Sequence, residues 1–180
     1  MVTLVEPARH GAFAATRPAL DDVWSALAGV PDPEIPVVSV VELGIVRRVH
    51  WEGDALRVSV TPTYSGCPAT DVIREDIRRA VRALGVDAVS IDIELSPAWT
   101  TDWIAPEAKR KLREFGIAPP GQAPRIDVSG ISPLRRRADV ACPRCGSKRT
   151  TLLAQFGSTA CKALYRCEAC REPFDHFKPH

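Results

Sequence analysis

Long apolar runs are absent from this chain of 180 residues, and none approaches the roughly 20 residues that a transmembrane helix requires. The N-terminus includes Glu6 and Arg9 and lacks the apolar core of a secretory signal peptide. Internal repeats are absent as well. We therefore expect a cytoplasmic protein without a membrane span, and not an array of similar modules.

Histidine is scarce, with four residues in the chain. The one that lies well inside the N-terminal domain outlined below is His50, on the polar side of a predicted strand, where we interpret it as a surface residue. A cysteine nucleophile is usually activated by a base such as histidine. The scarcity of histidine therefore disfavours a thiol-dependent enzyme with Cys67 as its nucleophile, which is one alternative hypothesis for the function.

Six cysteines are present, and in the cytoplasm they indicate metal binding or thiol chemistry rather than disulfides. The net charge of +2 is divided unevenly. Residues 1–118 hold 13 basic and 17 acidic side chains, whereas residues 119–180 hold 11 and 5. We therefore expect two modules with different surfaces.

Residues 18–116 carry the patterns of a small α+β domain, after an irregular segment at residues 1–17. Strands are predicted at 45–51, 55–61 and 89–95, and helices at 18–29, 68–84 and 106–115. A hairpin turn at Gly53 joins the first two strands. The prediction is a three-stranded sheet with helices on one face, whose third strand runs parallel to one of the others.

Alternation and helical spacing also predict which side chains face the core. In the second strand, Ser59 and Thr61 should face outward. In the third strand, Ile93 and Leu95 should face inward. Phe115 should lie on the apolar side of the last helix.

The stretch Thr61–Thr70 links a strand to a helix and contains Cys67. Pro68 suits the first position of a helix, so Cys67 is expected at the helix N-terminus. Unpaired N–H groups and the helix dipole would favour its thiolate there. The alternative is a small buried cysteine that packs under the helix.

Asp32 and Glu34 lie two residues apart in a loop with three prolines, Pro31, Pro33 and Pro36. Prolines exclude a helix here and hold the loop extended or turned. The two carboxylates could bind a metal or a proton. A solvated or capping role is the usual explanation for acids in such a turn.

Two CxxC motifs, Cys142–Cys145 and Cys167–Cys170, lie in residues 139–180, after a predicted linker at residues 117–138. Two such loops can surround one tetrahedral ion with four thiolates. The prediction is a zinc ribbon with one structural Zn²⁺ per chain, and iron in the same cage is the nearest competitor. A module this small would need the metal to fold.

Cys161 is a fifth cysteine in this tail, where four already complete a cage. It could be a packing residue. It could instead be an exposed thiol whose thiolate is favoured by neighbouring Lys162, and it could cooperate with Cys67 across the domain interface.

Three motifs resemble the MIP18 family of iron–sulfur assembly proteins, once called DUF59. They are Asp32-Pro33-Glu34-Ile35, Glu42-Leu43-Gly44-Ile45-Val46 and Thr61-Pro62-Thr63-Tyr64-Ser65-Gly66-Cys67-Pro68. The ribbon, with Phe156-Gly157-Ser158-Thr159-Ala160-Cys161-Lys162, is similar to one branch of that family, the PaaD branch of the phenylacetyl-CoA epoxidase system.

The resemblance implies a MIP18-type α+β fold and a part in the maturation of the multicomponent epoxidase of aerobic phenylacetate degradation. The partners would be the oxygenase subunit, with its diiron centre, or the reductase subunit, with its iron–sulfur centre. By resemblance, Cys67 corresponds to the family's reactive cysteine, and Asp32 and Glu34 to its acidic loop.

The leading hypothesis is a metallocentre assembly factor, an accessory protein rather than an enzyme, in which Cys67 is an exchangeable ligand for iron or an iron–sulfur cluster. Asp32 and Glu34 would supply oxygen ligands or accept protons. The alternative is a zinc-ribbon regulator that binds nucleic acid, which the basic tail permits but no stacking series supports. The sequence leaves open which subunit is the client and which metal or cluster Cys67 binds. It also leaves open whether two chains share a cluster through their Cys67 residues.

Overall fold

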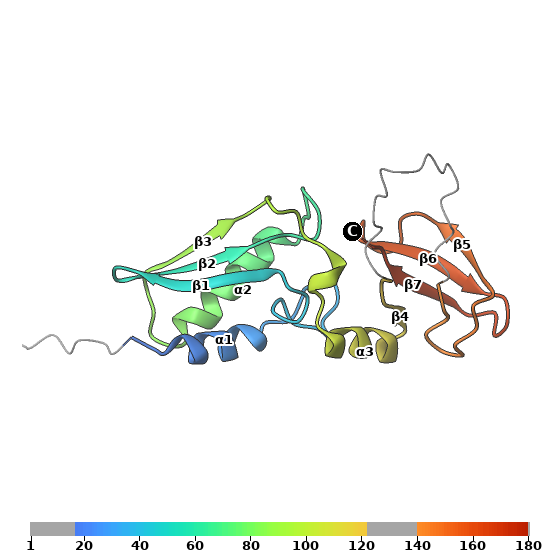
Figure 1. Cartoon of the computed structure of the whole chain (residues 1–180), viewed down its shortest axis with the longest axis horizontal. Helices are drawn as coiled ribbons and strands as arrows, with labels where there is room; N and C mark the ends of the chain where they lie inside the picture. The colour runs from blue at the N-terminus through green and yellow to red at the C-terminus, as the bar shows by residue number, and fades with distance from the viewer. Residues whose placement is uncertain (1–16, 122–139, 180) are drawn as a thin grey trace, which may run out of the picture.

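The computed structural model describes residues 17–121 and 140–179 (Figure 1). The predicted irregular segment at the N-terminus therefore lies outside the described residues except for Arg17, and the predicted linker lies outside them from residue 122 on. No helix in the described part of the chain is long and apolar enough to cross a membrane.

The first sheet has the order β1-β2-β3. The strands β1 (Val46–Glu52) and β2 (Ala55–Val60) form an antiparallel hairpin, and β3 (Val89–Ile93) pairs in parallel with β2. Leu56 and Val58 of β2 are fully buried, as their alternation predicts. The predicted three-stranded sheet with a parallel third strand is confirmed.

Two helices, α1 (Leu20–Ala28) and α2 (Thr70–Arg82), cover the same face of this sheet (Figure 1). Helical spacing gives each an apolar stripe that turns to the core. The buried residues of these stripes are Val23, Leu27, Ile73, Ile77 and Val81. A third helix, α3 (Pro106–Phe115), follows a short 3-10 turn at Thr101–Trp103, and Gly116 ends it in the left-handed region with φ +94°.

Several side chains depart from the predicted sides. Ser59 and Thr61 are buried, and residues of the segment after β3, among them Trp103, line the same surface hollow as Thr61. Ile93 and Leu95 are exposed, since Ile93 ends the edge strand β3 and Leu95 lies beyond it. Phe115, in the last turn of α3, is also exposed.

The second sheet contains the cysteine-rich tail and has the order β4-β7-β6-β5. Its strands are β4 (Ile117–Ala118), β5 (Thr150–Ala154), β6 (Lys162–Cys167) and β7 (Pro173–Phe177). The last three form an antiparallel ribbon, and β4 pairs in parallel with β7. The predicted linker thus begins with a strand of the ribbon sheet, which follows α3 directly (Figure 1).

The two parts of the molecule share one hydrophobic core. Phe177 of β7 and Cys161 belong to the same buried cluster as Val23 and Leu56. The ring of Phe177 lies 5.9 Å from that of Trp99, and the indole N–H of Trp99 donates to the carbonyl of Leu43 at 3.0 Å. The ribbon's own cluster is small, with buried Ala118, Val140, Cys142, Cys167 and Phe174.

Gly44 offers a test of the packing behind the acidic loop. It has φ +69°, and a Cβ built on it would lie 2.7 Å from the Cβ of Trp103. Gly53 has a similar φ of +56° but open space around it. We expect Gly53→Ala to lower the free energy of unfolding by about 1 kcal/mol and Gly44→Ala by about 3 kcal/mol, measured by urea denaturation. Equal losses in the two variants would contradict this packing.

Candidate functional site

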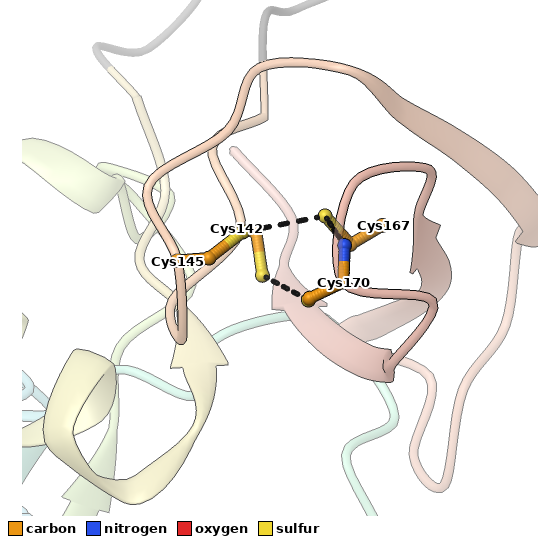
Figure 2. A group of neighbouring side chains, drawn as sticks. All are labelled: Cys142, Cys145, Cys167 and Cys170. Carbon is orange, nitrogen blue, oxygen red and sulfur yellow. Dashed lines mark hydrogen bonds between the residues drawn. The ribbon is translucent and has the colours of Figure 1, made fainter.

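The four cysteines of the two CxxC motifs converge on one point (Figure 2). The sulfur atoms of Cys142 and Cys170 are 3.8 Å apart, and those of Cys145 and Cys167 are 3.5 Å apart. All four sulfurs lie within 4.8 Å of one another. A tetrahedral zinc ion with Zn–S bonds of about 2.3 Å needs sulfurs about 3.8 Å apart, so the cage fits such an ion.

Each knuckle places a residue in the left-handed region after its second cysteine. These residues are Gly146, with φ +73°, and Arg171, with φ +67°. The turn directs backbone N–H groups inward, and that of Cys170 donates to the sulfur of Cys167 at 3.5 Å. These donors, of which the N–H of Cys170 has the largest effect, lower the pKa of Cys167 to about 6. The lowered pKa favours the thiolate, which is the form of cysteine that binds a metal.

A second group of polar side chains lines a small cavity where the ribbon meets the first sheet and its helices. We call it the seam pocket, and its ionisable members are Asp32, Glu34, Cys67 and Cys161. The cavity measures about 10 Å³. Its remaining walls are mostly apolar and include Ile35, Leu43, Ile45, Pro62, Ile73 and Phe177.

Asp32 organises the acidic loop. Its Oδ1 accepts hydrogen bonds from the backbone N–H groups of Glu34 at 2.9 Å and Ile35 at 2.8 Å. Burial raises the pKa of its carboxyl, although these two donors oppose the shift. The capping role that is usual for such an acid is therefore present, in a residue that also lines the seam pocket.

Glu34 is held beside the ribbon by this turn. Its Oε2 lies 3.5 Å from the sulfur of Cys161, which is 127 residues away in the chain. The negative charge of Glu34 also contributes to raising the pKa of both Cys67 and Cys161. One carboxylate therefore acts electrostatically on both thiols.

Cys67 does not occupy a helix N-terminus, contrary to the prediction. α2 begins at Thr70, so Cys67 and Pro68 lie in the preceding turn, where the N–H of Thr70 donates to the carbonyl of Cys67 at 3.1 Å. Burial in the partly apolar pocket raises the pKa of its thiol, and a backbone donor, Ala69, offsets this only in part. The side chain is partly exposed and stays a thiol at neutral pH.

Cys161 is buried, as the packing interpretation predicts, yet its sulfur faces the seam pocket. The hydroxyl of Thr159 lies 3.1 Å from this sulfur. Burial raises the pKa of Cys161 to about 11, so the alternative of an exposed thiolate is wrong. Lys162 does lower the pKa of Cys161, but its ammonium group is buried beside Asp175, at 3.7 Å, and its effect is smaller than that of burial.

Two residues that contact Cys67 or line the pocket were not singled out from the sequence as site residues. Tyr64 hydrogen-bonds to Cys67 from three residues earlier in the same loop, and burial raises its pKa to about 12. Its position in the Cys67 motif was an available signal. Phe177 forms a wall of the pocket from the far end of the chain, and nothing in the local sequence indicates that contact.

Comparisons with known proteins match each of the two parts of the chain to a family model. The family model described as "Iron-sulfur cluster assembly protein" matches residues 20–93, and the "PaaD zinc beta ribbon domain" matches residues 128–178. A protein of Escherichia coli (strain K12), described as a subunit of the 1,2-phenylacetyl-CoA epoxidase, is 49% identical over 161 residues, which are 89% of this chain and 93% of that protein. The chain belongs to the PaaD family.

Two further relatives match about half of this chain. An Fe-S protein maturation auxiliary factor of Porphyromonas gingivalis is 39% identical over 94 residues, 51% of this chain and 89% of that protein. The Fe-S protein maturation auxiliary factor YitW of Bacillus subtilis is 33% identical over 94 residues, 51% of this chain and 91% of that protein. This chain thus joins a segment that matches the iron–sulfur assembly model to a segment that matches the zinc ribbon model.

Metal removal tests the cage. Because the ribbon's own buried cluster is small, we expect a strong chelator to release about one metal ion per chain and to unfold residues 140–178 first. Hydrogen exchange with metal analysis measures this, with the amides of β1–β3 as the internal control. Full protection of the ribbon amides in metal-free protein would contradict the assignment.

Thiol alkylation tests the seam pocket. With metal in the ribbon cage and none in the seam pocket, we expect iodoacetamide to modify Cys67 more slowly than a free cysteine at neutral pH. It should modify Cys161 only after unfolding. Burial raises the pKa of both thiols. The rate at Cys67 should keep rising with pH beyond the ordinary thiol pKa of about 8.5. Mass spectrometry measures the rate at each cysteine. A rate at Cys67 that levels off below about pH 8.5 would contradict the raised pKa.

Proposed function

We propose that this protein is an accessory assembly factor that carries iron or an iron–sulfur cluster to a subunit of the phenylacetyl-CoA epoxidase, with Cys67 as the exchangeable ligand. The observation that carries the proposal is that Cys67, partly exposed, shares one cavity with the carboxylates of Asp32 and Glu34. The relatives described as Fe-S maturation factors support the same class of function.

The surroundings of Cys67 favour a carrier over an enzyme. No histidine or lysine lines the seam pocket among the described residues, so Cys67 lacks the imidazole base that usually activates a cysteine nucleophile. Burial and Glu34 keep the free thiol protonated, whereas an arriving cation would displace the proton and neutralise the thiolate. Cys67 would therefore be a thiol in the free pocket and a thiolate when a metal ion is bound.

The two thiol sites would have different tasks. Four sulfurs close the ribbon cage, and we assign it a structural Zn²⁺ because a closed tetrahedral set leaves no position for exchange. The seam pocket has one partly exposed sulfur and two carboxyl groups, a mixed set that suits iron and does not form a closed tetrahedral cage of thiolates.

The ribbon surface would dock the client, either the oxygenase or the reductase subunit. Arg144, Lys148 and Arg149 form no ion pair with any described residue, so their charges are available to an acidic surface. Nearby β5 exposes Leu152 and Leu153 at the edge of the ribbon sheet. A basic surface beside an apolar edge fits a protein partner better than nucleic acid, for which no stacking series is seen in the sequence.

Replacement of Cys67 in cells tests the function. We expect Cys67→Ser to lower epoxidase activity, and the iron content of the client subunit, by roughly 10- to 100-fold, because an oxygen ligand replaces the transfer thiolate. Ser65→Ala, an exposed change in the same loop, serves as the matched control. Normal activity and iron content in the Cys67→Ser strain, with the protein present at wild-type level, would refute the proposal.

A further inference from the structure

We propose that the seam pocket binds a single divalent transition-metal ion, ferrous iron in the cell, through the sulfurs of Cys67 and Cys161 and a carboxylate oxygen of Glu34. This inference rests on the proposed carrier function and specifies its cargo. It also makes the ribbon a contributor of one ligand, in addition to any role in docking.

The ligands come from three segments that are distant in the sequence. Glu34 lies in the proline-rich loop, Cys67 in the turn before α2, and Cys161 directly before β6 of the ribbon. All three line the same cavity, and the Glu34 oxygen is already 3.5 Å from the Cys161 sulfur. A cysteine that only fills space in a core does not need to face a carboxylate and share a cavity with a second thiol. This arrangement therefore favours a ligand role for Cys161.

The size of the free cavity favours an ion over a cluster. A space of about 10 Å³ admits about one water-sized atom. A cluster of two irons and two sulfides could not enter without separating the ribbon from the first sheet. That separation would expose Phe177, which is 1% accessible and packs against Trp99.

The chemistry of the ligand set limits the metal. Thiolate sulfur selects against Mg²⁺ and Ca²⁺, and a mixed sulfur and oxygen set suits divalent iron, cobalt or zinc. On binding, each thiol forms a metal–sulfur bond and releases its proton to solvent, and no electron is transferred. Asp32 acts as a positioning residue, because its Oδ1 is engaged by the backbone of Glu34 and Ile35.

The free pocket is not yet a finished site. Among the residues that the structure describes, the four ribbon cysteines are the one group of three or more His, Cys, Asp or Glu side chains arranged to hold a metal ion. Binding in the seam pocket must therefore draw the Cys67 turn inward. Gly66, with φ +94° and open space around it, can accommodate that movement.

The test is a cobalt titration of the full chain, anaerobic and reduced, with one zinc ion per chain already in the ribbon. Co²⁺ bound to thiolates gives an intense charge-transfer absorption. We expect one Co²⁺ per chain without loss of zinc, and bleaching of the band when Fe²⁺ competes. Cys67→Ser and Cys161→Ser should each lower the intensity by about half and weaken binding roughly 10- to 100-fold.

Two controls keep the result interpretable. Ser158→Ala, an exposed change near Cys161, should bind Co²⁺ like the wild type. Cys161→Ala repeats the thiol deletion without a buried hydroxyl, and a retained zinc ion shows that each variant has a folded ribbon.

Several outcomes would overturn the inference. If Cys161→Ser and Cys161→Ala keep the wild-type spectrum and affinity, Cys161 is no ligand, and the carrier role of Cys67 proposed above is unaffected. If wild-type protein binds no Co²⁺, or one per two chains, the single-ion pocket is wrong. The cellular Cys67→Ser experiment is independent, so its failure identifies the carrier function as the error.

Discussion

Phe177 extends from the last strand of the ribbon into the core of the first domain, where it packs against Trp99. Burial of one phenylalanine contributes about 2–3 kcal/mol, which is large for a module whose own buried cluster has five residues. The parallel pairing of β4 with β7 adds backbone hydrogen bonds to the same junction. These contacts place Cys161 opposite Glu34, and the seam pocket depends on them.

The acidic loop supplies the other half of that geometry by local means. Three prolines restrict the backbone, and the Asp32 carboxylate satisfies two N–H groups that would otherwise be unpaired in a buried turn. As a result Glu34 is directed toward the ribbon, where its carboxylate meets the sulfur of Cys161. The acidic loop on one side and the ring of Phe177 on the other line a cavity of about 10 Å³.

Under the proposed function, the two thiol environments would let one small protein both retain and release metal. In the ribbon, backbone N–H groups, from Cys170 first, lower the pKa of Cys167, and the four sulfurs are arranged to surround one ion. In the seam pocket, apolar walls and Glu34 raise the pKa of Cys67 and Cys161. In the proposed site a thiolate would exist mainly while a cation is bound, and protonation of the sulfur would favour release of that cation.

The sequence by itself determined the elements and the cage. Alternation in β2, helical spacing in α2 and the CxxC spacing are short-range patterns, and each reports which face of a segment is buried or which atoms meet. Only the tertiary structure decided that Cys161 faces Glu34, that Thr61 is covered and that Cys67 precedes its helix. The physical reason is that these depend on packing between segments as far as 127 residues apart, which leaves no periodic signal in either segment.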